Sequence, residues 1–254
     1  MALESAVTKA VELHNLSRRY GALYVLKDIN LTVSAGKTVV LRGGNGAGKT
    51  TFLRLLSSKL RPSRGGGKVF GHDLVKEAAQ VRSQIAYLTV LGGSYGTLSA
   101  LENLDFAAKL YGKRLSQEAL AGTLEQVGLG EAKDKLTRTF SSGMKKRLGV
   151  ARLLLSDANL WLLDEPYAAL DEDGKTLIDD LLVKAKAEGK TVMMASHDLA
   201  RSARFADSIL ALRQGQLFAS APVETTPEEV DARGYADTKP SAEVRAQAPK
   251  VAHV

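Results

Sequence analysis

Residues 43–50 combine glycines, a lysine and a hydroxyl side chain at a spacing that suits phosphate chemistry. They match the pattern G-x-x-x-x-G-K-[ST] and read Gly43, Gly44, Asn45, Gly46, Ala47, Gly48, Lys49 and Thr50, with Thr51 following. Glycines let successive backbone N–H groups converge on an anion, and the dipole of a following helix adds to the attraction. We expect Lys49 to reach the β- and γ-phosphates of ATP and Thr50 to ligate Mg²⁺. A Gly-rich turn with an incidental lysine is the alternative, but the strand expected before this phosphate loop and the helix expected after it favour a nucleotide site.

Two carboxylates follow an apolar run further along the chain. Residues 160–163 are continuously apolar, as a strand covered on both faces should be, and Asp164 and Glu165 come directly after them. Asp164 would hold the water shell of Mg²⁺, and Glu165 could polarise an attacking water. A strand that leads into an acidic turn is common, but paired with the phosphate loop it predicts the second half of a phosphoryl-transfer site.

With these motifs in this order, the chain resembles the ABC ATPases over about residues 8–219. The stretch Phe140-Ser141-Ser142-Gly143-Met144 is similar to the family signature, usually written L-S-G-G-Q, and departs from it at Phe140, Ser142 and Met144. In the family this stretch opens a helix whose N-terminus caps the γ-phosphate bound to the opposite subunit. The resemblance therefore implies that the signature residues Ser141, Ser142, Gly143 and Met144 act on the partner's nucleotide in a homodimer.

Three further residues take their expected roles from the resemblance. Tyr20 resembles the aromatic side chain that stacks on adenine, and Asp171 lies in a loop similar to the one that crosses the dimer interface. His197 resembles the switch histidine near the γ-phosphate. Outside this context, a lone tyrosine is usually a packing residue and a lone histidine usually structural. The expected catalytic residues are thus Glu165 and His197, and the expected cofactors are ATP and Mg²⁺.

One element of the family pattern is missing. The family has a glutamine just after the strand expected at residues 85–88, where it meets Mg²⁺ and the membrane partner, whereas this chain has Val90 in that register. A valine side chain has no donor and no acceptor. We expect Thr50, Asp164, phosphate oxygens and an extra water to hold the metal instead.

The elements expected around these motifs give an α/β fold. Apolar patterns predict strands in residues 10–42 and at 69–70, 85–88, 160–163, 191–195, 209–212 and 217–219. Helical spacing predicts helices at residues 50–60, 100–111, 116–127, 142–155 and 174–188. The resemblance implies a P-loop NTPase with a mixed β-sheet core, an N-terminal antiparallel β-subdomain and an inserted α-helical subdomain at about residues 95–155. Residues 220–254 hold four of the six prolines and few large apolar residues, which predicts a mostly disordered tail.

Composition narrows the function classes. The 254 residues are 44% hydrophobic and 25% charged, as in ordinary soluble proteins, and the absence of cysteine excludes disulfides and thiolate metal sites. The net charge of +7 is spread along the chain without interleaved aromatic residues, so we expect no nucleic-acid partner. No signal-like start is present and no apolar run approaches the roughly 18–20 residues that span a bilayer. We therefore expect a cytoplasmic protein, peripheral on the inner face of the cell membrane, with integral-membrane permease subunits as partners.

The expected function is that of the ATP-hydrolysing, nucleotide-binding subunit of an ABC exporter. Residues 98–104, 151–155 and 160–166 look like the haem exporter ATPases of cytochrome c maturation, so haem export is the most specific expectation. Drug- and ion-exporting relatives share these motifs and remain an alternative. A soluble ABC ATPase, such as an iron–sulfur assembly factor, also stays open, whereas DNA repair and translation ATPases are disfavoured because the chain has neither a long coiled coil nor tandem ATPase domains.

Overall fold

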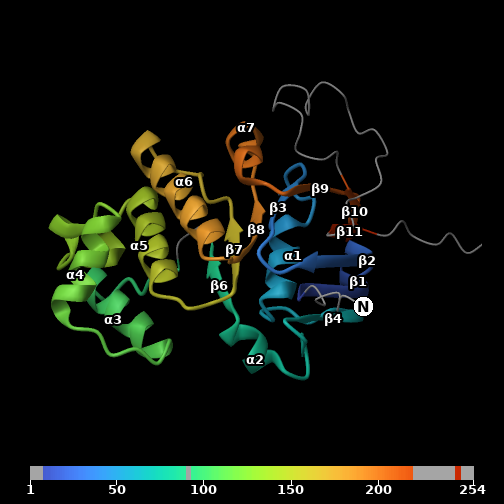
Figure 1. Cartoon of the computed structure of the whole chain (residues 1–254), viewed down its shortest axis with the longest axis horizontal. Helices are drawn as coiled ribbons and strands as arrows, with labels where there is room; N and C mark the ends of the chain where they lie inside the picture. The colour runs from blue at the N-terminus through green and yellow to red at the C-terminus, as the bar shows by residue number, and fades with distance from the viewer. Residues whose placement is uncertain (1–7, 90–92, 220–243, 247–254) are drawn as a thin grey trace, which may run out of the picture.

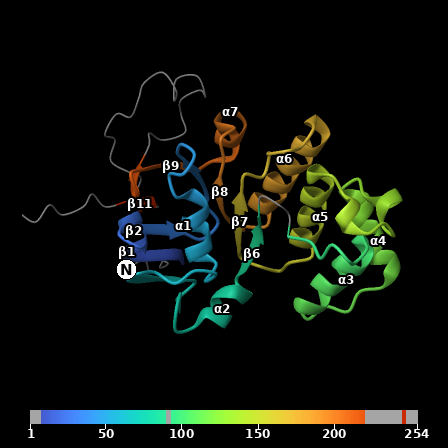
Figure 2. The same cartoon turned by 180° about the vertical axis from the view of Figure 1, so that it is seen from behind.

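Two β-sheets lie on either side of the helix that follows the phosphate loop, and a group of helices covers the far face of the larger sheet (Figure 1). The computed structural model describes residues 8–89, 93–219 and 244–246. The helix between the sheets is α1 (Lys49–Leu56). The reverse view shows it between the antiparallel sheet and the central strands (Figure 2).

The central sheet carries the carboxylate strand near one edge. Its strands are β3 (Thr38–Arg42), β6 (Ile85–Leu88), β7 (Leu160–Asp164), β8 (Thr191–Ala195), β9 (Ser208–Arg213) and β10 (Gln216–Ala219). Their order is β10-β9-β3-β8-β7-β6, and all neighbours are parallel except β10 and β9, which are antiparallel. Because buried parallel strands are apolar on both faces, the continuous apolar runs identified this sheet from the sequence.

The second sheet is antiparallel and is built mainly from the N-terminal residues. Its strands are β1 (Lys9–Tyr20), β2 (Leu23–Ser34), β4 (Arg64–Val69), β5 (His72–Asp73) and β11 (Val244–Ala246), in the order β11-β2-β1-β4-β5. The strand expected at residues 69–70 begins earlier, at Arg64, so the glycine run at residues 65–67 is part of β4. A Cβ at Gly65 would lie 2.1 Å from the carbonyl O of Asn15, and one at Gly67 would lie 2.3 Å from that of Glu12, so β1 passes too closely for any side chain.

The tail prediction concerns residues 220–254. Within that segment the structure describes β11, which pairs with β2 from Leu31 to Val33. The other residues of the tail lie outside the described part of the chain, so their disorder stays a prediction. The proposed domain limits, 8–219, stay a prediction as well.

The remaining helices mostly cover the face of the central sheet that turns away from α1. They are α2 (Ala78–Ser83), α3 (Ala100–Leu110), α4 (Gln117–Gln126), α5 (Ser142–Leu154), α6 (Glu172–Ala187) and α7 (Leu199–Ser202), with short 3₁₀ turns at Gly130–Ala132, Thr137–Thr139 and Ala203–Phe205. Helices α3, α4 and α5 form the group at the left of Figure 1 and fall in the stretch expected as the helical insertion. Because side chains alternate across a strand, Trp161 and Leu163 of β7 pack under these helices while Leu160 and Leu162 join the core around α1.

Helix α1 is shorter than expected. It ends at Leu56, with Ser57 as its C-cap, and Ser58 has a φ of 54°. A left-handed residue at this point stops the helical hydrogen-bond pattern. Apolar spacing up to Leu60 therefore overestimated the helix by about one turn, because periodicity does not report where the backbone reverses.

Candidate functional site

The phosphate loop joins β3 to α1 in a conformation that needs glycine at particular points. Gly48 precedes α1 with a φ of 105°, and a Cβ there would lie 3.0 Å from the carbonyl O of Val25. A Cβ at Gly43 would lie 2.6 Å from the carbonyl O of Leu212. The glycines thus permit the left-handed turn and a close approach of two neighbouring strands.

A cavity of about 250 Å³ opens over this loop. It is lined by Val25, Gly44, Asn45, Gly46, Ala47, Gly48, Lys49, Thr50, Thr51, Glu165 and His197. The structure therefore brings the phosphate loop together with the two residues expected to be catalytic. Tyr20 is not in this lining: it is 47% exposed at the end of β1, with the guanidinium of Arg18 at 4.6 Å from its ring centre.

Lys49 places a buried cation in the cavity. Its side chain is almost fully buried, and its Nζ donates to the carbonyl O of Gly43 at 2.7 Å. The same Nζ lies 3.1 Å from Nε2 of His197 and 3.7 Å from Oε1 of Glu165. An ammonium group held by backbone carbonyl acceptors and close to two polar side chains is well placed to meet a phosphate anion.

Asp164 is fixed by two hydroxyl groups. Thr50 Oγ1 donates to its Oδ1 at 3.0 Å, and the Tyr87 hydroxyl donates to its Oδ2 at 3.3 Å. Asp164 is 2% exposed. Burial, with the nearby charge of Asp164, raises the pKa of the Tyr87 phenol above its ordinary value, so the phenol stays a donor near neutral pH.

This pair fits the magnesium ion that such chemistry requires. Thr50 and Asp164 offer a hydroxyl and a carboxylate oxygen side by side, and oxygen is the donor that Mg²⁺ prefers. Within the described ranges no cluster of three or more histidine, cysteine, aspartate or glutamate residues could hold a metal ion. A metal held by one carboxylate, one hydroxyl, phosphate oxygens and water stays the expectation for this pair. Val90, in the register of the missing glutamine, lies outside the described residues.

Glu165 occupies a constrained turn at the end of β7. Its φ is 49°, a left-handed value that is uncommon outside glycine, and its N–H donates to the carbonyl O of Ala195 at 2.8 Å. The backbone N–H of His197 donates to Oε2 at 3.1 Å. Oε1 is buried and accepts no hydrogen bond within the described residues. A carboxylate oxygen of this kind, on the cavity wall, could accept a proton from an attacking water.

The signature residues lie apart from the cavity, at the start of α5. Ser141 caps this helix by accepting from the backbone N–H of Met144 at 3.2 Å. Beside it, Asp171 caps α6 by accepting from the N–H of Gly174 at 2.9 Å and pairs with Arg147 at 2.8 Å. These two hydrogen bonds hold the pKa of Asp171 below its ordinary value. The structure thus brings the signature and the Asp171 loop together, on a surface separate from the phosphate loop of the same chain.

Sequence reasoning missed three residues at this site. Tyr87 sits in the apolar strand β6, where a phenol needs a polar partner, and that requirement was the available signal. Lys146 and Arg147 belong to the run Lys145-Lys146-Arg147, whose charges alone assign it no role at the site. Helical spacing places Lys146 on the buried side of α5, four residues before Val150, and burial lowers its pKa to about 8 against the opposing charges of Asp164 and Glu165.

Comparison with known families gives a match to the ABC transporter family over residues 26–168, more than half of the chain. The chain belongs to the ABC transporter family. The match starts in β2, before the phosphate loop, and runs past Glu165, so the phosphate loop and both carboxylates lie inside it, whereas His197 lies beyond its end.

Individual relatives agree with this assignment. The cytochrome c biogenesis ATP-binding export protein CcmA of Xanthomonas axonopodis pv. citri (strain 306) is 40% identical over 184 residues, which cover 72% of this chain and 85% of CcmA. The bacitracin transport ATP-binding protein BcrA of Enterococcus faecalis is 36% identical over 208 residues, which cover 82% of this chain and 67% of BcrA. The dimeric ATP-binding cassette MJ0796, solved with ADP and Pi, superposes with a TM-score of 0.77 at 25% identity, covering 85% of this chain and 99% of the cassette.

These matches confirm the fold expected from the sequence, an α/β P-loop NTPase with a mixed core sheet. The protein is an ATP-binding, ATP-hydrolysing subunit of an ABC transporter. None of the helices in the described part of the chain has the length and apolar character to cross a membrane.

Proposed function

We propose that this ABC ATPase powers export, and that the exported substrate is haem for cytochrome c biogenesis. The observation that carries the ATPase part is the meeting of Lys49, Glu165 and His197 around one cavity, with Asp164 beneath it. In this proposal the phosphate loop and Lys49 bind the β- and γ-phosphates, and Tyr20 stacks on adenine. Mg²⁺, held by Thr50 and Asp164, would neutralise charge on the phosphates. Glu165 takes the proton of the attacking water, and His197 orients the γ-phosphate.

The working unit in this proposal is a homodimer. Ser141 and Ser142 are exposed at the N-terminus of α5, and no signature residue lines the cavity of the same chain. A helix N-terminus favours an anion, so a second copy could present its signature to the nucleotide bound here. The dimeric MJ0796 cassette supports this arrangement.

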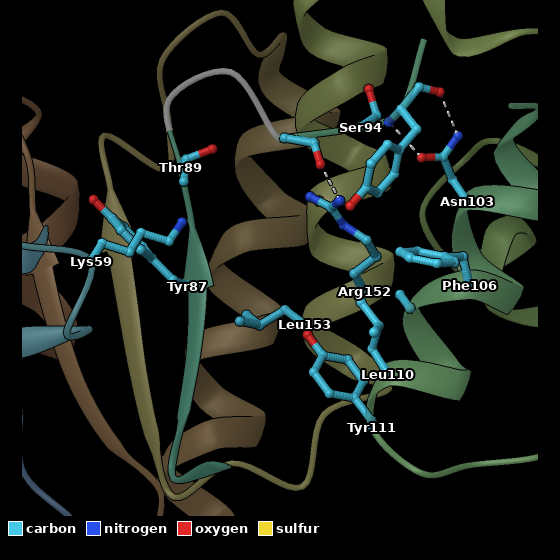
Figure 3. A pocket seen from close by; sticks show the side chains of 14 residues that line it. Lys59, Tyr87, Thr89, Ser94, Asn103, Phe106, Leu110, Tyr111, Arg152 and Leu153 are labelled. Carbon is cyan, nitrogen blue, oxygen red and sulfur yellow. Dashed lines mark hydrogen bonds between the residues drawn. The ribbon is translucent and has the colours of Figure 1, made fainter. Parts of the chain in front are cut away.

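A groove beside the site suits a membrane partner. It has a volume of about 280 Å³ and lies between β6, α3 and α5. Phe106 and Leu110 of α3, with Tyr111 at its C-cap, face Arg152 and Leu153 of α5 (Figure 3). Arg152 also donates to the carbonyl O of Gly93, at the end of the loop in which the family carries its glutamine. Leu110 is 69% exposed, and a cluster of exposed apolar and aromatic side chains is typical of a protein contact. We assign this groove to integral-membrane permease subunits, which would place the chain at the inner face of the cell membrane.

The haem assignment rests on the comparison with CcmA. Identity of 40% over most of the length of CcmA exceeds the 36% shared with BcrA. Export of a drug or an ion is the second candidate, and the BcrA relative is the observation that favours it.

Deletion of the gene in its own host tests the cargo. We expect c-type cytochromes to lose covalent haem, seen by haem staining of membrane proteins, and the wild-type gene to restore it. Lys49→Ala should fail to restore it, whereas Lys184→Ala, an exposed lysine on α6, should succeed. Normal c-type cytochromes together with raised sensitivity to a peptide antibiotic would instead favour the drug exporter.

A further inference from the structure

A fully buried lysine contacts the backbone of the catalytic glutamate. Lys146, in the second turn of α5, is 0% exposed. An ammonium group taken out of water is strongly destabilising unless its donors find acceptors. Its Nζ lies 2.9 Å from the carbonyl O of Glu165, 3.3 Å from that of Thr89 and 3.5 Å from that of Asp164. Three donors thus meet three backbone carbonyls, and Lys146 forms no ion pair within the residues that the structure describes.

These carbonyls belong to segments on which hydrolysis depends. Glu165 is left-handed, with a φ of 49°, and its N–H is held by Ala195 of β8. Its C=O is held by Lys146. Both polar groups of the strained peptide backbone are therefore fixed, one by the central sheet and the other by α5. Without the second contact, the backbone of Glu165 could relax toward a commoner conformation and its carboxylate would turn away from the cavity.

Lys146 also connects this turn to the signature. The signature residues open α5, and Lys146 lies on the same helix only four residues after Ser142. Thr89, the third acceptor, directly follows β6. One side chain therefore joins the signature helix to the ends of the two strands that carry Tyr87 and Asp164.

We propose that Lys146 is a positioning residue for ATP hydrolysis, which holds the backbone of Glu165 so that its carboxylate faces the cavity and ties that geometry to the position of α5. The inference rests on the proposed role of Glu165 as general base. Lys146 does not line the cavity, and it contacts Asp164 and Glu165 only through their backbone carbonyls. It acts on the rate through Glu165 and not on nucleotide affinity.

Two substitutions of similar length separate positioning from simple packing. Lys146→Met keeps the unbranched shape without a donor, whereas Lys146→Gln keeps an amide that can donate to the carbonyls. For Lys146→Met we expect kcat to fall about tenfold or more, part of the roughly 10²–10⁴-fold contribution of a general base. The KM for ATP and the Kd of a fluorescent ATP analogue should stay within about threefold. Lys146→Gln should recover a clear part of the lost kcat.

A matched core variant controls for stability. Leu124 is buried in α4 and does not line the cavity, so Leu124→Ala should lower Tm without lowering kcat at a temperature where the protein is folded. Lys146→Met with kcat within twofold of wild type would overturn the proposal. Equal kcat values for Lys146→Met and Lys146→Gln would also overturn it. So would a loss of nucleotide affinity in Lys146→Met that is as large as its loss of kcat.

A double-mutant cycle shows whether Lys146 acts through Glu165. In a Glu165→Gln background, Lys146→Met should change the residual rate by less than about twofold, because the positioned base is already gone. If Lys146→Met does not fold, Lys146→Gln replaces it in the same cycle. An equal loss of kcat in the wild-type and Glu165→Gln backgrounds would contradict the proposal, and so would no loss of kcat in either background. A wild-type protein without ATPase activity, or a fully active Glu165→Gln, would instead refute the proposed role of Glu165 itself.

Discussion

At the scale of single residues, the cavity gathers side chains with separate tasks. Lys49 supplies a buried positive charge, and Thr50 and Asp164 carry the oxygen atoms that we propose as Mg²⁺ ligands. Glu165 has a carboxylate oxygen that accepts no hydrogen bond within the described residues. Phosphoryl transfer is catalysed mainly by positioning and charge neutralisation. Each side chain can therefore be tested by a substitution that removes one task and leaves the shape unchanged.

Glu165→Gln removes the proton acceptor and keeps the size of the side chain. We expect turnover to fall by roughly 10²-fold or more, the contribution of a general base, while ATP still binds. An ATP-bound dimer should then accumulate, which size-exclusion chromatography with light scattering would detect. Near-normal turnover in the purified variant would show that another group activates the water.

Tyr87→Phe removes one of the two hydroxyl groups that fix Asp164. Because a single hydrogen bond contributes about 0.5–1.5 kcal/mol, we expect the Mg²⁺ concentration for half-maximal ATPase activity to rise about two- to tenfold. Tyr167→Phe is the matched control, since the Tyr167 hydroxyl donates to Asp179 at 2.9 Å, away from the metal ligands. Equal Mg²⁺ titration curves for wild type and Tyr87→Phe would show that the Tyr87 hydroxyl does not contribute to Mg²⁺ binding.

The site residues that could be predicted from the sequence are those whose neighbours along the chain form a recognisable motif. Lys49, Thr50, Asp164 and Glu165 are recognisable because loop and strand signals adjoin them, and the structure brings them together with His197. Tyr87 and Lys146 could not be assigned in that way. Asp164, the partner of Tyr87, is 77 residues away, and Glu165, the partner of Lys146, is 19 residues away. Lys146 contacts a backbone carbonyl, and every residue type has one, so the identity of residue 165 does not indicate the contact.

At the scale of elements, sheets were easier to predict than their edges. Apolar runs predicted the parallel strands, but for β4 the sequence predicted only residues 69–70. The strand begins at Arg64, and its glycines, which allow close approach of another backbone, resemble a loop in sequence. The pairing of β11 with β2 could not be predicted from the sequence either. Its partners, Val244 and Val33, are separated by most of the chain, and three residues are too few to show a pattern.

Removal of the tail tests what β11 contributes. Among the residues beyond 219, the structure describes only β11, and none of its residues lines the cavity over the phosphate loop. For a chain that ends at residue 220, we expect ATPase activity within about twofold of the full chain, which is less than about 0.5 kcal/mol in the barrier. The melting temperature should fall slightly, because β2 loses its neighbour at the sheet edge. A large loss of rate would mean that the tail helps to complete the dimer.

At the scale of the whole molecule, the phosphate loop and the signature-like residues lie on separate surfaces of one chain, and we propose that they are two half-sites. The phosphate loop lies over the central sheet, whereas the signature opens α5 beside the Asp171 loop. Gly143 lies close to that loop, since a Cβ there would come 3.0 Å from the carbonyl O of Ala169. A substitution such as Gly143→Asp would therefore disturb the signature surface and add negative charge where an anion is expected.

Mixing two inactive chains tests whether the half-sites meet across a dimer. Lys49→Ala spoils the phosphate loop, Gly143→Asp spoils the signature, and each protein alone should hydrolyse ATP at background rate. If a two-fold dimer pairs the loop of one chain with the signature of the other, an equal mixture forms mixed dimers with one intact site each. Half of the dimers are then mixed, and the mixture should recover about a quarter of the wild-type rate. Steady-state ATPase assays after co-incubation with ATP measure this recovery. If the ATPase rate of the mixture stays at background, either the signature acts within its own chain or mixed dimers do not form. Co-purification of the two variants with different affinity tags separates those outcomes, because mixed dimers that form and stay inactive contradict the trans arrangement.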